Sequence, residues 1–138
     1  MKLRILAVLA LLAVTGLAGT ATAQSTLGWG SSPQLLGEYT AYIGPRDLRA
    51  SDGIRLTAAW QIIRQDRANY HRFGRRDRGD QGDTFFGSVE NRAIMERIVR
   101  DGTMSPSAAR AIVAGDVWIN VRIYGRGSQG QRVEVTVN

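Results

Sequence analysis

The end of the chain alternates between apolar and polar residues. In the segment 117–124, VWINVRIY, every second residue is valine or isoleucine, and the segment 132–138, RVEVTVN, repeats this pattern. A period of two is typical of a strand with one buried face. The connector 125–131, GRGSQGQ, is rich in glycine, so we expect an antiparallel hairpin closed by a loose loop.

A third alternating segment lies nearer the start, at residues 38–44, EYTAYIG. One face of this segment would carry Tyr39, Ala41 and Ile43, and the other face would carry Glu38, Thr40 and Tyr42. The pattern predicts a short strand. Ser51, Asp52 and Gly53 then indicate a turn before the next element.

Between this strand and the hairpin, the apolar spacing changes to that of helices. The first helix is expected to begin near Thr57, a residue type that caps helix N-termini, and to end near Phe73. Gly74 follows as a natural C-terminal stop. The segment 75–83, RRDRGDQGD, has no apolar residue, so we expect a solvated loop there.

Two further helices are expected before the hairpin. One should span residues 88–101, where apolar residues recur at helical spacing. The other should open at Ser105 and Pro106, a capping serine followed by proline at the first helical position, and end at Gly115.

The resulting order β-α-α-α-β-β predicts an α+β domain. We expect a small antiparallel sheet whose C-terminal hairpin packs against the helices. The valine and isoleucine face of the hairpin should be the one that the helices cover.

The N-terminus has the pattern of a secretory signal peptide, residues 1–23. Lys2 and Arg4 precede an uncharged apolar run, residues 5–17, and the small-residue motif 21–23, ATA, fits a cleavage site. The apolar run is shorter than the roughly 20 residues that cross a bilayer. We therefore expect export by the general secretory route, to the periplasm or the outside of the cell, and no membrane span after cleavage.

Cleavage after residue 23 would leave a tether and one domain. Residues 24–37, rich in glycine, serine and glutamine, are expected to be a flexible N-terminal tether, and residues 38–138 a single α+β domain. The chain has no cysteine, so packing rather than disulfide bonds must stabilise an exported domain.

The charge is moderately basic and is carried by arginine. The chain has 18 Lys and Arg against 12 Asp and Glu; without Lys2 and Arg4 the balance becomes 16 against 12, a net charge of +4. Every remaining cation is then an arginine, whose planar fork suits carboxylates and phosphates. A charge of this size is too small to indicate nucleic-acid binding by itself, and we do not expect nucleic acid as the partner.

The first helix places two charges within its apolar side. A helical wheel puts Asp66 and Arg67 inside the sector that should be buried, four residues before Tyr70 and His71 respectively. Since an unpaired buried charge is costly, each must have a partner. One interpretation is a local polar network that orients the helix. The other is a catalytic cleft in which His71 acts as general acid or base with Asp66 and Arg67.

The predicted hairpin offers a candidate binding surface. Trp118, Asn120, Arg122 and Tyr124 share the strand face opposite the valine and isoleucine residues. A row of aromatic and arginine side chains on a sheet can stack on sugars or bases. In the alternative interpretation, Trp118 and Tyr124 pack across the sheet or are covered by the segment 35–36.

No complete catalytic or metal-binding signature is present. The chain lacks a G-x-S-x-G elbow, and a single histidine without cysteine would leave a metal site only carboxylate ligands. We expect no metal and no cofactor.

Two long segments and the two predicted C-terminal strands are similar to parts of other proteins. The segments are LTAAWQIIRQDRANYHRFG, residues 56–74, and NRAIMERIV, residues 91–99; the strands are 119–124 and 133–137. In these parts the chain resembles small exported hypothetical proteins of proteobacteria. The resemblance implies export and a single domain, and no site residue carries over from it.

Two functions fit these patterns. The first is an exported, non-enzymatic binding domain whose partner is an envelope protein or an anionic or saccharide ligand. The second is a small hydrolase or phosphodiesterase that uses His71 with Asp66 and Arg67.

Overall fold

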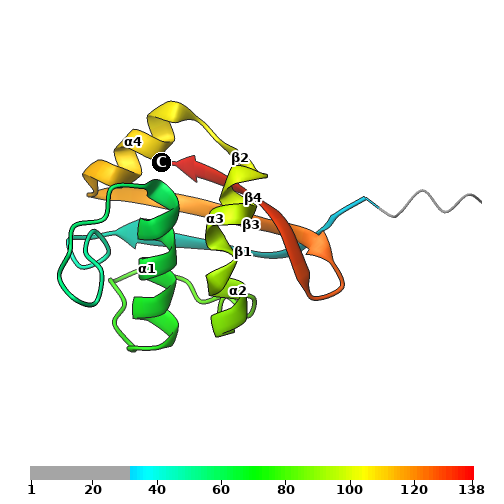
Figure 1. Ribbon diagram of the computed structural model, residues 1–138, viewed down its shortest axis with the longest axis horizontal. Coiled ribbons are helices and arrows are strands. Elements are labelled where there is room, and N and C mark those ends of the chain that lie inside the picture. The colour runs from blue at the N-terminus through cyan, green and yellow to red at the C-terminus, as the bar shows by residue number, and fades with distance from the viewer. Residues whose placement is uncertain (1–31) are drawn as a thin grey trace, which may run out of the picture.

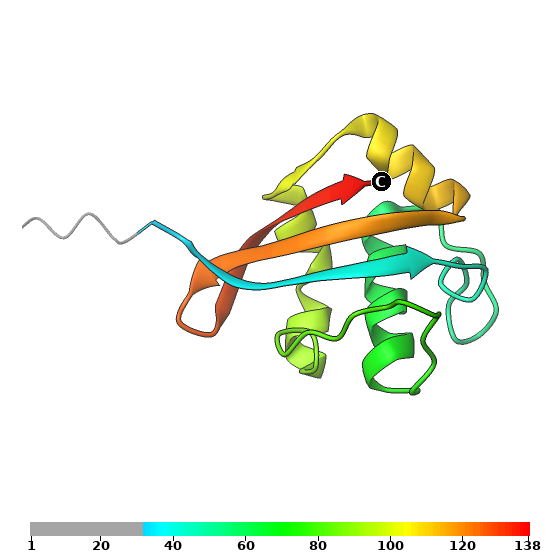
Figure 2. The ribbon, with the colours of Figure 1, turned by 180° about the vertical axis from the view of Figure 1, so that it is seen from behind.

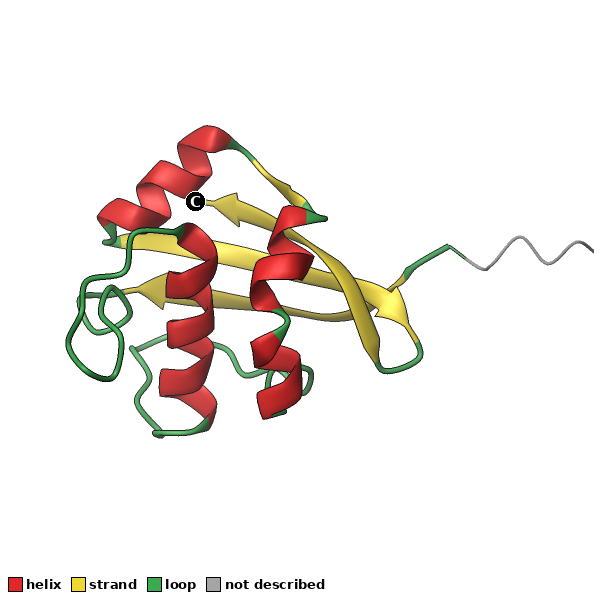
Figure 3. Cartoon of the chain, viewed as in Figure 1, coloured by secondary structure: helices red, strands yellow, loops and turns green. Residues whose placement is uncertain are grey.

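The computed structural model describes residues 32–138 and forms one sheet with helices on one of its faces (Figures 1 and 3). The strands are β1 (Gln34–Ile43), β2 (Thr103–Met104), β3 (Val117–Arg126) and β4 (Gln129–Val137). The helices are α1 (Ala59–His71), α2 (Val89–Ala93), α3 (Met95–Arg100) and α4 (Pro106–Ala114). The expected signal peptide, and the part of the expected tether before residue 32, lie outside the described residues.

The sheet confirms the α+β prediction and its C-terminal hairpin. Its strand order is β1-β3-β4-β2, with β3 antiparallel to both β1 and β4. The two-residue strand β2 is an addition that the sequence pattern did not predict, and it runs parallel to β4. The sheet is therefore mixed rather than purely antiparallel.

The hairpin is tighter than expected. β3 extends to Arg126 and β4 begins at Gln129, so the two strands include most of the glycine-rich connector. An irregularity in register between Tyr124 and Gly125 accommodates the extra length. The prediction of a loose loop over residues 125–131 was wrong because glycine content cannot distinguish a bulged strand from a loop.

The first strand starts earlier than the alternation indicated. β1 begins at Gln34, so residues 34–37, assigned to the tether from their composition, form part of the sheet. The register shifts between Leu35 and Gly37. This irregularity interrupts the apolar–polar alternation, which explains why the pattern is readable only from Glu38 onward.

The helix ends follow some of the expected signals. Ser105 caps α4 by accepting a hydrogen bond from the Ala108 backbone, and the proline occupies the first turn as predicted. At α1 the cap residue is Ala58 rather than Thr57, because Gln61 Oε1 reaches back to the backbone N–H groups of both. Gly74 adopts a positive φ of 62°, as expected for a residue that follows a helix end.

The helix predicted over residues 88–101 is divided in two. Ile94 leaves helical geometry, with φ −88° and ψ 7°, and separates α2 from α3. Ser88 still caps the first piece through the Asn91 backbone. Met95 and Ile98 of α3 are fully buried in the core.

The core lies between the sheet and the helices. The alternating residues of the strands point inward as predicted and meet the apolar faces of α1, α3 and α4. The fully or almost fully buried contributors include Tyr39, Ala41, Ile43, Ile119, Val121, Ile123, Val133 and Val135 from the sheet, and Ile62, Ile63, Met95, Ile98 and Ile112 from the helices. The opposite sheet face is not covered by any described helix, as the view from behind shows (Figure 2).

Within residues 32–138, none of the helices has the combination of length and apolar character that a membrane crossing requires.

Candidate functional site

The two charged side chains on the apolar side of α1, Asp66 and Arg67, are buried. Arg67 Nε donates to Asp66 Oδ2 at 2.7 Å, and the two side chains are 0% and 3% exposed. The helical wheel correctly indicated that both are buried and partnered. The spacing paired Asp66 with Tyr70 and Arg67 with His71, whereas in the structure Asp66 and Arg67 bond to each other and Arg67 lies over the Tyr70 ring, 4.9 Å from its centroid.

Arg67 also forms hydrogen bonds to the loop that follows α1. Its Nη1 donates to the backbone carbonyl of Gln81 at 2.9 Å and to Asp83 Oδ2 at 3.1 Å. Its guanidinium lies over the ring of Tyr39, 3.9 Å from the ring centroid, so β1 supplies an aromatic platform for the charge. One arginine thus ties together the helix, the loop and the first strand.

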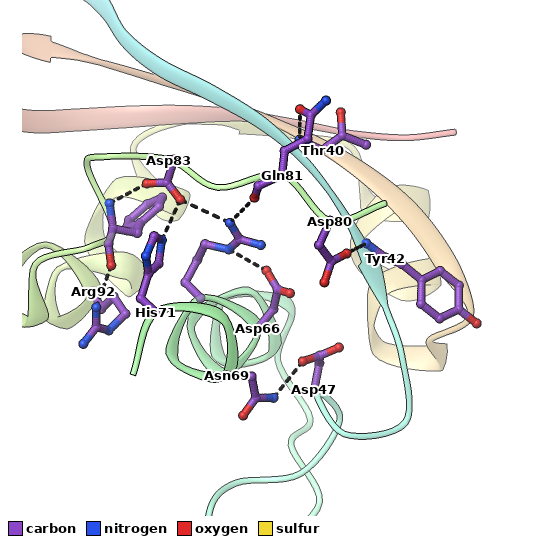
Figure 4. Close-up of polar contacts among 12 residues, drawn as sticks. Thr40, Tyr42, Asp47, Asp66, Asn69, His71, Asp80, Gln81, Asp83 and Arg92 are labelled. Carbon is purple, nitrogen blue, oxygen red and sulfur yellow. Dashed lines mark hydrogen bonds and ion pairs between the residues drawn. The ribbon is translucent and has the colours of Figure 1, made fainter. Parts of the chain in front are cut away.

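His71 joins the same network at its edge. Its Nε2 lies 3.0 Å from Asp83 Oδ2, the oxygen that also accepts from Arg67, and its side chain is 15% exposed. The other carboxylate oxygen of Asp83 accepts from the Phe86 backbone. Figure 4 shows Asp83 at the centre of these contacts, with His71 reaching it from α1. The structure therefore brings the three predicted residues into one network, through an aspartate that the prediction did not include.

The network carries more negative than positive charge. Asp66 and Asp83 face the single guanidinium of Arg67. Burial raises the pKa of Asp66 from 3.8 to about 7, although the neighbouring Arg67 opposes the shift. Near neutral pH the network can therefore take up a proton at Asp66 and leave Arg67 balanced by Asp83.

A second buried carboxylate lies beside the first. Asp47 accepts from Asn69 Nδ2 at 2.8 Å and from the Gly44 backbone at 2.9 Å. Burial raises the pKa of Asp47, opposed by these hydrogen bonds. Neither Asp47 nor Asn69 was among the predicted site residues. The available signal was Asn69 itself, an amide among the buried positions of α1 that needs a partner.

The segment 75–83 lies at the surface, as its composition predicted, but it is bonded to the sheet. It runs along the free edge of β1, where the Gln81 backbone donates to the Thr40 carbonyl at 2.8 Å. Gln81 Oε1 accepts from the Thr40 backbone at 3.0 Å, and Asp80 Oδ1 accepts from the Tyr42 backbone at 2.8 Å (Figure 4). These polar groups complete the hydrogen bonds of an edge strand, a requirement that the loop's own composition does not reveal.

The predicted binding residues lie together on the uncovered face of the sheet, here called the open face. β3 runs between β1 and β4, and its outward residues align with theirs in cross-strand pairs. The open face consists of Glu38, Thr40 and Tyr42 from β1, Trp118, Asn120, Arg122 and Tyr124 from β3, and Arg132, Glu134 and Thr136 from β4.

The aromatic residues of the open face are half-buried by their neighbours. The rings of Trp118 and Tyr42 lie 5.5 Å apart, and the loop residue Gly79 packs against the Trp118 ring. Arg132 lies 4.3 Å from the Tyr124 ring centroid. Packing across the sheet, one of the two interpretations of these side chains, therefore accounts for part of their burial.

The charges of the open face neutralise one another. Arg122 lies between Glu38 and Glu134, 3.8 Å from each, and Arg132 bonds to Glu134 at 2.8 Å. Asn120 donates to Glu38 at 3.0 Å. Exposed ion pairs of this kind contribute little to stability, so a ligand can compete for these groups at small cost.

Among residues 32–138 there is no group of three or more His, Asp or Glu side chains arranged to hold a metal ion. Asp77, Asp80 and Asp83 instead have separate partners: Arg46, the β1 edge and Arg67.

Comparison with known proteins returned no relative: no family model, no curated protein and no solved structure matches the chain.

Proposed function

We propose that this protein is exported and acts as a non-enzymatic binding domain whose contact surface is the open face. The N-terminal pattern of residues 1–23 supports export. The observation that carries the proposal is the row of partly exposed side chains on β3, where Trp118, Asn120, Arg122 and Tyr124 lie in register between two strands with no described helix above them.

The chemistry of the open face favours a neutral polar ligand, and a saccharide fits best. Its two arginines are balanced by Glu38 and Glu134, so the face offers no excess charge to a polyanion. Aromatic rings beside amide and carboxylate groups supply the apolar faces and hydrogen bonds that sugars use. A flat polar region of an envelope protein is the competing partner.

The alternative is a hydrolase or phosphodiesterase that uses His71 with Asp66 and Arg67. The contact between His71 and Asp83 resembles a histidine oriented by a carboxylate. Asp66 and Arg67, however, are closed to solvent and bonded to each other, so neither can touch a substrate in this conformation. The geometry therefore supports a structural role for this pair and favours the binding domain.

The proposal is tested with neutral oligosaccharides, including uncharged peptidoglycan-derived glycans, as probes in a thermal-shift screen and by calorimetry. A ligand at 100 times its Kd adds about 2.7 kcal/mol to the free energy of unfolding, which a melt can detect. Trp118→Ala and Arg122→Ala should each abolish the shift while far-UV circular dichroism stays native. Arg110→Ala, which removes an exposed arginine from α4, is the matched control and should leave binding intact.

Binding that survives in both open-face variants would contradict the proposal. The enzymatic alternative is assayed in parallel with bis-(p-nitrophenyl) phosphate. Hydrolysis that disappears in His71→Ala, while the variant stays folded, would favour the alternative instead.

A further inference from the structure

A hollow rich in arginine lies away from the open face, between α1 and the loop that leads into it. The hollow has a volume of about 460 Å³, and Arg46, Arg49 and Arg75 line it. Gln65 and Asn69 from α1 also contribute to its lining, and Asn69 is held in place by Asp47. In Figures 1 and 2 the loop after β1 lies beside α1, and these two segments supply most of the lining residues of the hollow.

A second hollow of about 330 Å³ continues the first along α1. The two share Ala50, Ser51, Gln65 and Phe73 in their linings. The second hollow adds Arg64 and Arg72 to the set of lining arginines. Trp60, near the start of α1, also lines the second hollow. The two adjoining hollows are together called the arginine groove here, and they are lined by Arg46, Arg49, Arg64, Arg72 and Arg75.

Among the described residues, no aspartate or glutamate lines the arginine groove. Four aspartates lie near it, and three of them, Asp47, Asp77 and Asp80, line an adjoining hollow with Arg46 and Arg75. Asp47 is bonded to Asn69, Asp52 to the Ile54 backbone and Asp80 to the Tyr42 backbone, whereas Asp77 lies 3.6 Å from Arg46. Among the described residues, Arg46 is the only one of the five groove arginines in an ion pair, so the groove keeps excess positive charge, in contrast to the balanced open face.

Two of the guanidiniums are positioned by an aromatic ring. Phe73 is 39% exposed, and the Cζ atoms of Arg72 and Arg75 lie 5.1 and 5.6 Å from its ring centroid. Contact with a ring holds an arginine near one orientation while its N–H donors remain available. Arg49, on the opposite wall, is held by a hydrogen bond to the Gly53 carbonyl at 3.0 Å.

The position at the end of α1 explains only part of this cluster. Arginines near a helix C-terminus complement its negative dipole, which would account for Arg72 and Arg75. Arg46 and Arg49 come from the preceding loop and face the groove from the other side. Convergence of arginines from both walls on a concave space indicates a ligand with several negative charges.

We propose that the arginine groove is a binding site for a free oligophosphate, a soluble molecule with closely spaced phosphate groups. One phosphate carries too little charge to balance five arginines, and a concave groove suits a short chain better than a flat membrane surface. This site is separate from the open face and does not depend on the function proposed for it. The two surfaces would let the domain hold an anionic and a neutral ligand at once.

The experiment uses the chain expected after cleavage of the signal peptide, residues 24–138, with inorganic tripolyphosphate as the probe in calorimetry at low ionic strength. Arg49→Gln and Arg75→Gln should each weaken binding about tenfold, the effect of losing one charged hydrogen-bond partner. Binding should also weaken as salt screens the charges. Arg110→Gln, the same change on exposed α4, should leave the affinity unchanged, and so should Trp118→Ala on the open face.

Three outcomes would overturn the proposal. The first is no binding of tripolyphosphate to the unchanged protein. The second is an equal loss in Arg110→Gln and Arg75→Gln, which would indicate attraction by overall charge. The third is binding to vesicles of anionic phospholipid without binding to tripolyphosphate, which would assign the arginines to a membrane surface. Circular dichroism of each variant separates loss of binding from loss of fold.

Discussion

Arg67 and Asp83 lie 16 residues apart in the chain, and their side chains meet at 3.1 Å in the interior. This contact closes the segment between them into a loop and holds it against β1. The guanidinium of Arg67 also bonds to its helix neighbour Asp66 and lies over the Tyr39 ring of the first strand. The charge at the centre of α1 therefore holds a helix, a loop and a strand together at one point.

Replacing Arg67 should be the most disruptive single change in α1. Arg67→Met would leave Asp66 and Asp83 buried without their shared cation, which typically costs about 3–5 kcal/mol. Urea unfolding measures the loss. Arg64→Met, an exposed arginine one turn earlier, is the matched control and should change stability by less than about 0.5 kcal/mol. Similar effects of the two substitutions would show that the buried network is not an important source of stability.

Stability should depend on pH through Asp66. Its pKa is raised from 3.8 to about 7, so between these values the folded protein binds a proton that the unfolded chain releases. Asp66 therefore contributes stability at pH below 3.8, and this contribution is lost as pH rises through about 7. Asp66→Asn keeps the shape and an oxygen for Arg67, and its stability should fall less steeply over this range.

Asp47 also has a raised pKa, so the informative quantity is the difference between the two pH profiles, measured by urea unfolding at each pH. Parallel profiles for the unchanged protein and Asp66→Asn would contradict the assignment. Asp52→Asn, at an exposed turn, serves as the control for a general loss of one negative charge.

Removing the Tyr39 hydroxyl should not destabilise the protein. The hydroxyl is buried with no hydrogen-bond partner among the described residues, whereas the ring supports Arg67. Tyr39→Phe keeps the ring and removes an unsatisfied polar group, so the free energy of unfolding should stay the same or rise by about 1 kcal/mol. A fall of more than this amount in a thermal or urea melt would indicate that the hydroxyl has a partner.

Gly79→Ala should disturb the contact between the loop and the open face. Gly79 has a φ of 95°, and an added Cβ would lie 2.8 Å from Trp118 Cη2. We expect a loss of about 1–3 kcal/mol together with a shift in tryptophan fluorescence as the ring is displaced. Gly53→Ala isolates the backbone effect, since φ there is 87° and nothing lies within 4 Å of an added Cβ. Equal losses and unchanged fluorescence in both variants would remove the packing argument.

The features that could be predicted are those encoded in local patterns. Alternation located the hairpin, and the serine–proline pair located the start of α4. The helical wheel of α1 indicated that Asp66 and Arg67 are buried and need partners. These signals depend on neighbours within one or two turns, where sequence spacing and spatial distance are closely related.

The remaining features depend on contacts between distant segments. β2 has only two residues, and it is a strand because β4 passes beside it. Asp80, Gln81 and Asp83 looked like part of a soluble loop, because polar composition describes a segment in water and not one that completes a strand edge or a buried ion pair. Their partners, Tyr42, Thr40 and Arg67, are 14 to 41 residues away in the chain.

The pairing of β1 with β3 has a consequence for when the chain can fold. Paired residues of these two strands, such as Glu38 and Arg122, are separated by most of the described chain. The central strands of the sheet, β3 and β4, are therefore the last two strands to be synthesised. Contacts of such long range make folding slow relative to local structure. An exported chain, as we propose this one to be, would benefit from this delay: β1 cannot pair with β3 until residues 117–126 have been synthesised, which keeps the first strand open to the export machinery.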